Sequence, residues 1–176
     1  YTGALNGDVK GLKIGVVTEG FGHPESMAEV DTAVREAVKY LGSLGAEITE
    51  VSIPEHMTAV PIWLGIIVEG SINNGAQGLH AYQTRGWYNP RLMASVLRSA
   101  KINGGDSSPT VKLGTLVGQY LREQYHGTFY ARAQNMARVL TGAYNRALEG
   151  VDLLLMPTTP MTAHDLPPTV TEDRTP

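Results

Sequence analysis

The segment GVDLLLMPTTP, at residues 150–160, constrains the fold more than any other part of this sequence. A nearly continuous apolar run at residues 151–156 is followed by two prolines, which lack the amide hydrogens that a continuing strand would donate. Such a run is typical of a strand covered on both faces, as in a largely parallel sheet with helices on either side. Ligands of open α/β sheets collect beyond the carboxyl ends of strands. Thr158 and Thr159 therefore either line a pocket or belong to a rigid turn.

The first third of the sequence predicts a strand, a helix and a second strand. Residues 13–17, KIGVV, have the β-branched apolar character of a buried strand. Ser26 and Glu29 have the spacing of a helix capping box, and Gly45 is placed to end the helix in a left-handed conformation. Residues 46–53 predict the second strand, with a bulge or a strong twist because its apolar residues change face. Strand, helix and strand in this order predict a parallel crossover.

The middle of the sequence predicts a series of helices. One runs from Pro61 to about Ile72 and is followed by the Gly- and Asn-rich residues 73–78. Asn89-Pro90 and Ser108-Pro109 are both helix-start signals. The region that follows is too long for one ordinary helix, so His126-Gly127 predicts a break, after which a second helix continues toward Gly150. We therefore expect a helical region between the two halves of the sheet.

Composition excludes several classes of function. With 176 residues and 42% hydrophobic content, the chain is expected to form one domain. A net charge of -3 disfavours nucleic acid and anionic membranes as partners, and the longest apolar stretch, residues 60–68, is too short to span a bilayer. The absence of cysteine removes thiol chemistry and is compatible with the cytoplasm, which is the location we expect. Because the chain begins with Tyr1 rather than Met, we expect a processed molecule or part of a longer polypeptide.

The sequence contains few candidates for catalysis or metal binding. None of its five histidines stand four residues apart, so no metal site is predicted. The run GGDSSP at residues 104–109 lacks the lysine of a phosphate loop and the glycines that flank a nucleophilic serine, and a helix cap explains Ser108. Trp63 lies in an apolar stretch, where two interpretations stay open: burial in the core and the lining of a pocket.

Four segments together resemble the carboxy-terminal half of an amidase signature family hydrolase. They are GLKIGVVTEGFG at 11–22, EVDTAVREAVKYLGSLGAEITEVSIP at 29–54, YARAQNMARVLTGAYNRALEGVDLLLMPTTP at 130–160 and DLP at 165–167. The nearest likeness is to bacterial amidases associated with nitrile hydratase, through GFGHPES, the Ile62-Trp63 region and GWYNPRLMASVLRS. The resemblance implies an α/β fold with a mixed, largely parallel sheet flanked by helices. Residues 1–168 would be an incomplete amidase domain and residues 169–176 a flexible tail.

The resemblance also implies a mechanism whose reactive groups lie elsewhere. In a Ser-cis-Ser-Lys triad, one serine attacks the amide carbonyl, the second serine and a neutral lysine relay its proton, and backbone amides hold the oxyanion. No GGSSGGS-like run is present in this sequence, and Ser107-Ser108 lies in the wrong part of the family pattern. We therefore expect no catalytic residue among these 176 positions and an inactive isolated chain.

By the same resemblance, this chain would supply scaffold and substrate-pocket wall. The implied pocket residues are Trp63, Ile67, Pro157, Thr158 and Thr159. The implied partners are a small-molecule amide and the remaining part of the amidase polypeptide, with a homodimer as a further option and with no cofactor, nucleic acid or membrane. Two alternatives stay open. One is a stand-alone α/β module that binds a small ligand at the carboxyl edge of the sheet, and the other is an amidotransferase A-type subunit that would act on charged tRNA.

Overall fold

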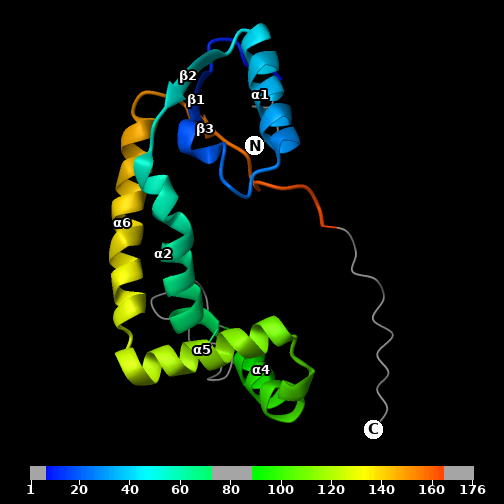
Figure 1. The fold of residues 1–176 in the computed structure, drawn as a ribbon, viewed down its shortest axis with the longest axis vertical. Helices are drawn as coiled ribbons and strands as arrows, with labels where there is room; N and C mark the ends of the chain where they lie inside the picture. The colour runs from blue at the N-terminus through cyan, green and yellow to red at the C-terminus, as the bar shows by residue number, and fades with distance from the viewer. Residues whose placement is uncertain (1–6, 73–88, 165–176) are drawn as a thin grey trace. The chain divides into compact units, whose positions relative to one another are not determined.

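A computed structural model describes residues 7–72 and 89–164, and it divides the chain into two compact units (Figure 1). Unit 1 comprises Tyr1–Pro54 and Asn145–Pro176, and unit 2 comprises Glu55–Tyr144. The assignment of residues 1–168 to one domain stays a prediction. The expected break at residues 73–78 and the expected tail at residues 169–176 lie outside the described residues.

Unit 1 contains a parallel sheet of three strands. Strand β1 (Lys13–Val17) lies between β2 (Glu47–Val51) and β3 (Leu153–Leu155), and it pairs in parallel with both. The central strand is also the most deeply buried, with Ile14 and Val17 exposing at most 1% of their surface. Helix α1 (Ala28–Ser43) connects β1 to β2 and lies beside the sheet (Figure 1). The predicted parallel strand–helix–strand unit is confirmed.

The pairing of β1 with β2 contains no bulge. Its register runs without interruption from the pair Lys13 and Glu47 to the pair Val17 and Val51, so the predicted bulge is wrong over these five pairs. The physical reason is that the strand ends at Val51. The next apolar residue, Ile53, lies two positions beyond the end of β2 and is only 2% exposed, so it belongs to the core without being part of the paired strand. The apparent change of face in the sequence therefore falls outside the paired strand.

Strand β3 is shorter than its apolar run. It covers Leu153–Leu155, and these three leucines are half-buried rather than fully buried. Asp152 lies just before the strand, where its N–H donates to the Lys13 carbonyl at 2.9 Å. In return, the Lys13 N–H donates to the Asp152 carboxylate at 2.8 Å. This reciprocal pair fixes the register of β3 against β1 at the start of the strand.

The predicted capping box at the start of α1 is wrong. The helix begins at Ala28 with Met27 as its N-cap, which offers no side-chain cap, and the Ser26 hydroxyl is buried without a hydrogen-bond partner. The reason is a contact distant in sequence, because the Met27 N–H donates to the Pro160 carbonyl at 2.8 Å. Asp31, in the first turn, instead accepts the Gly22 N–H at 2.9 Å. Gly45 follows the helix with φ of 97°, as predicted.

Unit 2 is helical. Its described elements are α2 (Ala59–Ile66), a π-helix over Ile67–Ile72, α4 (Pro90–Asn103), α5 (Pro109–Tyr125) and the main part of α6 (Thr128–Leu148). Short 3-10 turns also occupy Pro54–Thr58, where unit 2 begins, and Gly104–Asp106, and a third, Thr18–Gly20, lies in unit 1. Both predicted caps are confirmed. The Asn89 side chain accepts the Arg91 and Leu92 N–H groups at 3.1 Å each, and the Ser108 hydroxyl accepts the Val111 N–H at 3.4 Å.

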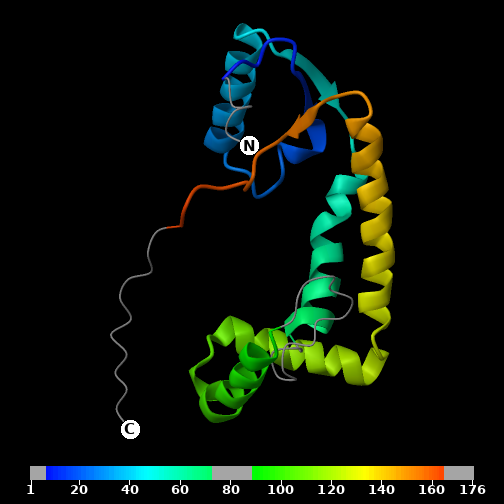
Figure 2. The ribbon, with the colours of Figure 1, turned by 180° about the vertical axis from the view of Figure 1, so that it is seen from behind.

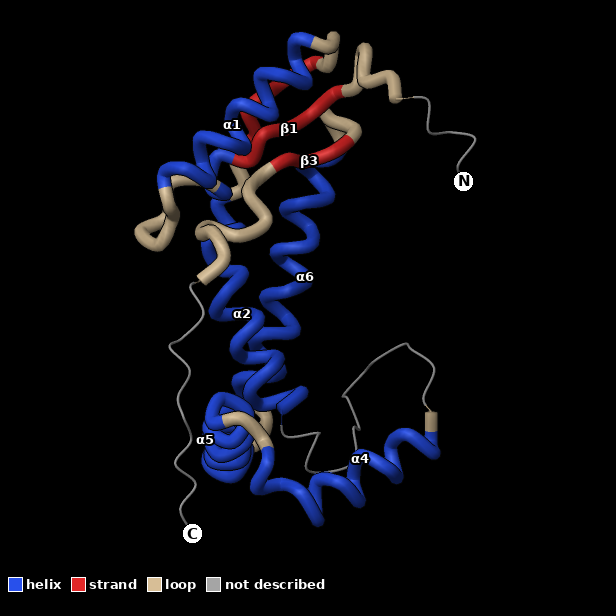
Figure 3. The backbone as a smooth tube through the Cα atoms, turned by 90° about the vertical axis from the view of Figure 1, so that its right-hand side faces the viewer, coloured by secondary structure: helices blue, strands red, loops and turns tan. Residues whose placement is uncertain are grey.

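The predicted break at His126-Gly127 is confirmed and separates α5 from α6 (Figure 3). His126 has φ of 53° and Gly127 has φ of 81°, so both adopt the left-handed region that ends a helix. The His126 N–H still donates to the Arg122 carbonyl at 3.0 Å and closes the last turn of α5. The chain can therefore change direction within two residues.

Helices α2 and α6 run side by side in unit 2 (Figures 1 and 2). Gly65 of α2 and Gly70 of the π-helix both lie in close contact with α6. A Cβ atom added to Gly65 would lie 2.8 Å from the Ala133 Cβ, and one added to Gly70 would lie 2.7 Å from the ring of Tyr130. Within the described ranges, no helix combines the length and the apolar character that crossing a bilayer requires.

Candidate functional site

The carboxyl end of β1 carries an ionised glutamate that ties two strands together. The Ser52 hydroxyl donates to one oxygen of the Glu19 carboxylate at 2.5 Å, and the Ile53 N–H donates to the other at 2.7 Å. The hydrogen bond from Ser52, followed by that from Ile53, lowers the pKa of Glu19 from 4.5 to about 2. Glu19 therefore acts as a fixed anion that joins the exit of β1 to the exit of β2.

The exit of β3 lies at the same edge of the sheet. A Cβ atom added to Gly20 would lie 2.6 Å from the Met156 Cβ, so the segments after β1 and β3 are in contact. Beyond Met156, Pro157 is half-buried, whereas Thr158 and Thr159 are exposed. The Thr159 hydroxyl donates to the Met161 carbonyl at 3.1 Å, which is a turn contact. The predicted position of the two threonines beyond the strand is confirmed, and their role in a pocket stays a prediction.

Trp63 and Ile67 lie one helical turn apart in unit 2, because the Ile67 N–H donates to the Trp63 carbonyl. Trp63 exposes 57% of its surface, so the interpretation that placed it in the core is wrong. Ile67 is half-buried. Within unit 2 the structure places Trp63 and Ile67 close together, and within unit 1 residues 157–159 are consecutive. The exposed indole is available for binding, and its role as a pocket wall stays a prediction.

An apolar groove lies between α2 and α6. It encloses about 310 Å³ and includes neither Trp63 nor Ile67 among its lining residues, which are Met57, Thr58, Pro61, Ile62, Gly65, Phe129, Arg132, Ala133 and Met136. Its chemistry suits an apolar group, because Arg132 is the one charged residue among those that line it.

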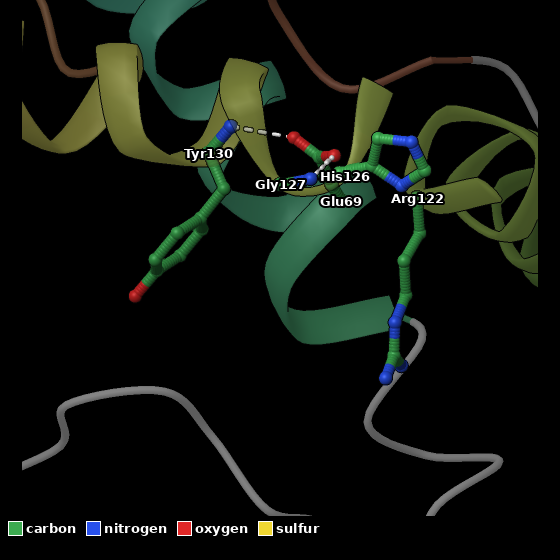
Figure 4. Close-up of a pocket in the computed structure, with 5 residues that line it drawn as sticks. All are labelled: Glu69, Arg122, His126, Gly127 and Tyr130. Atoms are coloured by element: carbon green, nitrogen blue, oxygen red, sulfur yellow. Dashed lines mark hydrogen bonds between the residues drawn. The ribbon is translucent and has the colours of Figure 1, made fainter. Parts of the chain in front are cut away.

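A second cavity, of about 320 Å³, surrounds a buried carboxylate at the junction of α5 and α6 (Figure 4). It is lined by Glu69, Arg122, His126, Gly127 and Tyr130. Glu69 is only 3% exposed, and its two oxygens accept the Gly127 N–H at 2.8 Å and the Tyr130 N–H at 2.6 Å. Figure 4 shows the Arg122 guanidinium extending away from this carboxylate.

Glu69 satisfies two of the backbone donors that the start of α6 leaves unpaired. A negative charge at this end of a helix also complements the helix dipole. Hydrogen bonds to a charged group contribute about 1.5–3 kcal/mol each, so Glu69 is a strong anchor for the α5–α6 junction. Sequence reasoning missed it, although a signal exists: Glu69 is the one charged residue in the apolar run at residues 60–72.

A further polar contact in unit 2 joins His56 to Tyr144. His56 Nδ1 lies 2.6 Å from the Tyr144 hydroxyl, and burial raises the pKa of that tyrosine. Across residues 7–72 and 89–164, no group of three His, Cys, Asp or Glu side chains lies together in a way that could hold a metal ion. The described residues therefore supply anchored carboxylates and apolar surface.

The parallel sheet and the helical unit have the fold of solved amidase-type proteins. A crystal structure of an amidase matches with a TM-score of 0.62 at 24% identity, covering 93% of this chain and 31% of that one. The A subunit of the glutamyl-tRNA(Gln) amidotransferase of Thermotoga maritima matches with a TM-score of 0.56 at 22% identity, covering 91% and 29%. These likenesses confirm the predicted fold class.

The chain belongs to the amidase family, whose sequence model matches residues 1–174. It is 38% identical over 168 residues to an enantioselective amidase of Rhodococcus rhodochrous, covering 95% of this chain and 32% of that protein. It is also 33% identical over 168 residues to the A subunit of a glutamyl-tRNA(Gln) amidotransferase of Acaryochloris marina, covering 93% and 33%. The predicted resemblance is confirmed. The chain spans about a third of the length of these curated relatives.

Proposed function

We propose that this chain is part of a carboxamide amidase, which hydrolyses small amides to carboxylic acid and ammonia. The observation that carries the proposal is the family match over residues 1–174, together with 38% identity to an enantioselective amidase over 168 residues. The fold of the described residues agrees with this family. A small-molecule amide is accordingly the proposed substrate, and the remaining part of an amidase polypeptide is the proposed partner.

In this proposal the chain contributes the scaffold and one part of the pocket wall. The proposed wall residues are Trp63, Ile67, Pro157, Thr158 and Thr159. Support comes from the exposed indole of Trp63 and from the position of the two threonines beyond a parallel strand. The nucleophile, its proton relay and the oxyanion donors come from other residues, because this sequence contains no Gly- and Ser-rich signature.

The test is a chimera. The stretch of the Rhodococcus rhodochrous amidase that matches this chain is replaced by the corresponding residues of this chain, and ammonia release is measured with benzamide and propionamide. We expect turnover by the chimera and none by the purified chain of 176 residues. Turnover by the chain alone at a rate above that of buffer would contradict the proposal. A folded chimera without activity on any carboxamide would contradict it as well.

The second candidate function is the amidotransferase A type, with charged tRNA as its substrate. It is favoured by 33% identity to the Acaryochloris marina protein, which is lower than the identity to the enantioselective amidase. The net charge of -3 offers little attraction for a polyanion. Filter binding of the chimera to charged tRNA separates the two candidates: retention of tRNA together with absence of carboxamide hydrolysis would favour the amidotransferase type.

A further inference from the structure

Helix α5 exposes an apolar row along one side. Leu113, Leu116, Val117 and Tyr120, here called the α5 stripe, are spaced so that they share one helix face. Their exposed fractions are 63%, 70%, 40% and 57%. The ring of Tyr120 also meets the ring of Tyr125 edge to face, with 6.5 Å between centroids. Single exposed apolar residues are ordinary, whereas a contiguous row on one helix face marks an interaction surface.

The opposite side of α5 is already used by the fold. Gly118 is buried there, and α5 packs against the π-helix over Ile67–Ile72. At about 100° per residue, Gly118 lies about 150° around the helix from the middle of the α5 stripe. The stripe therefore points away from the packed side of the helix.

Two opposite charges flank the α5 stripe on the same side. Lys112 stands near its amino end and Glu123 near its carboxyl end, and both side chains are exposed. Around the helix axis they lie within about 20° of each other. When two copies of α5 pair antiparallel about a two-fold axis, the residues on one side of the α5 stripe face the residues on the same side of the stripe in the other copy. An axis midway between Leu116 and Val117 thus brings Lys112 level with Glu123 of the second copy, within about 3 Å along the helix.

We infer that the α5 stripe is a self-association surface whose occupant is a second copy of this chain, with its α5 antiparallel. Such an interface is isologous, so one Lys112–Glu123 ion pair forms at each end of the apolar seam. A single helix pair covers less than the roughly 1,600 Å² of a standard stable interface. The dimer is therefore weak and depends on protein concentration.

Both charged groups keep the capacity for this contact. The Lys112 ammonium donates to the Gly105 carbonyl at 2.5 Å, and two further hydrogens remain on the nitrogen. The Glu123 Oε1 accepts from the Gln119 side chain at 2.6 Å, which leaves the second carboxylate oxygen for a partner. These contacts tie Lys112 to the 3-10 turn before α5 and Glu123 to Gln119 within α5.

Sedimentation velocity of the full chain, from about 1 to about 300 µM, tests the inference because this range brackets weak protein association. We expect a monomer–dimer equilibrium that Leu116→Glu abolishes. Lys112→Glu sets like charges against each other at both ends and is expected to weaken association about tenfold. The charge-swapped variant Lys112→Glu with Glu123→Lys restores it. The matched control is Tyr40→Glu, because Tyr40 is an exposed apolar residue of α1, at 64% exposure.

Three results would overturn the inference. A chain that stays monomeric throughout the range would show that the α5 stripe does not bind a second copy. A dimer that Leu116→Glu does not weaken would place the interface elsewhere. Failure of the charge-swapped variant to recover the association lost in Lys112→Glu would exclude the antiparallel pairing. Circular dichroism of each variant verifies that its helical content is retained.

Discussion

At the scale of single residues, the most consequential interactions join positions far apart in the sequence. Glu19 accepts hydrogen bonds from Ser52 and Ile53, and Glu69 accepts them from Gly127 and Tyr130. Glu19 accepts from the Ser52 hydroxyl and the Ile53 N–H, whereas Glu69 accepts from two backbone N–H groups at the start of α6. Hydrogen bonds to an ionised carboxylate are among the strong ones. These two glutamates fix the ends of strands in unit 1 and the junction of two helices in unit 2.

The low pKa of Glu19 predicts a particular loss of stability in acid. Its pKa is about 2 in the folded chain against an ordinary value of 4.5, so its contribution is complete above pH 4.5. The contribution is lost as the pH falls from 4.5 toward 2, because the unfolded chain then binds the proton first. In Glu19→Gln, the urea midpoint of unfolding should fall less between pH 5 and pH 3 than in the unchanged chain.

The control for this prediction is Glu36→Gln, which removes the same charge from an exposed position of α1. This control should retain the acid dependence of the unchanged chain. Identical pH profiles for Glu19→Gln and the unchanged chain would contradict the role assigned to Glu19.

Local sequence signals predicted helix caps and left-handed residues correctly, whereas they did not predict contacts between residues far apart in the sequence. The caps Asn89 and Ser108 and the left-handed Gly45 depend on neighbours within a few positions, and the structure confirms them. Ser26 failed as a cap because Pro160, distant in sequence, takes the adjacent amide of Met27. Glu19 and Glu69 were missed for the same reason, since their partners lie more than thirty and more than fifty positions away.

At the scale of elements, α2 and α6 meet in a close contact at Gly65. Gly65 faces the Cβ of Ala133, and the Phe129 carbonyl lies 3.4 Å from the position that a Gly65 Cβ would occupy. A methyl group at Gly65 has no room unless the helices separate. Backbone and Cβ atoms set this contact, so no rearrangement of a flexible side chain can relieve it.

Gly65→Ala should therefore destabilise the chain. Overpacking costs about 1–3 kcal/mol, and the better helix propensity of alanine offsets up to about 1 kcal/mol of it. We expect a net loss of roughly 1–2 kcal/mol in the free energy of unfolding, measured by urea denaturation. Gly105→Ala serves as the control, because a Cβ there meets nothing within 4 Å. A gain of stability in Gly65→Ala would contradict the close packing.

The elements themselves were largely predictable, because apolar periodicity and turn residues are local. The strands, the helices and the break at His126-Gly127 all lie where the pattern placed them. The errors concern ends and registers. Asp152 and Lys13 set where β3 begins. Ile53 lies beyond the end of β2, so the change of face in the sequence pattern does not correspond to a bulge in the paired strand. Such boundaries are decided by tertiary contacts that periodicity does not report.

At the scale of the whole molecule, the family and fold were predictable because motifs spread over the entire chain agree in order and spacing. The proposed pocket is a different matter. Trp63 and Ile67 belong to unit 2, and residues 157–159 belong to unit 1, so their shared role in a pocket stays a prediction. The exposure of Trp63 was also unpredictable, because an apolar stretch suits a core and a binding surface equally well.

Whether these residues line a carboxamide site is tested most directly by the substrate preference of the chimera after Trp63→Ala. Apolar contacts discriminate substrates by about 10- to 200-fold. We predict that Trp63→Ala lowers kcat/KM for benzamide about tenfold more than for propionamide. The control Tyr40→Ala, which removes another exposed aromatic ring, should leave the ratio unchanged. An unaltered ratio in an active Trp63→Ala chimera would contradict the claim that this chain forms part of the substrate-pocket wall.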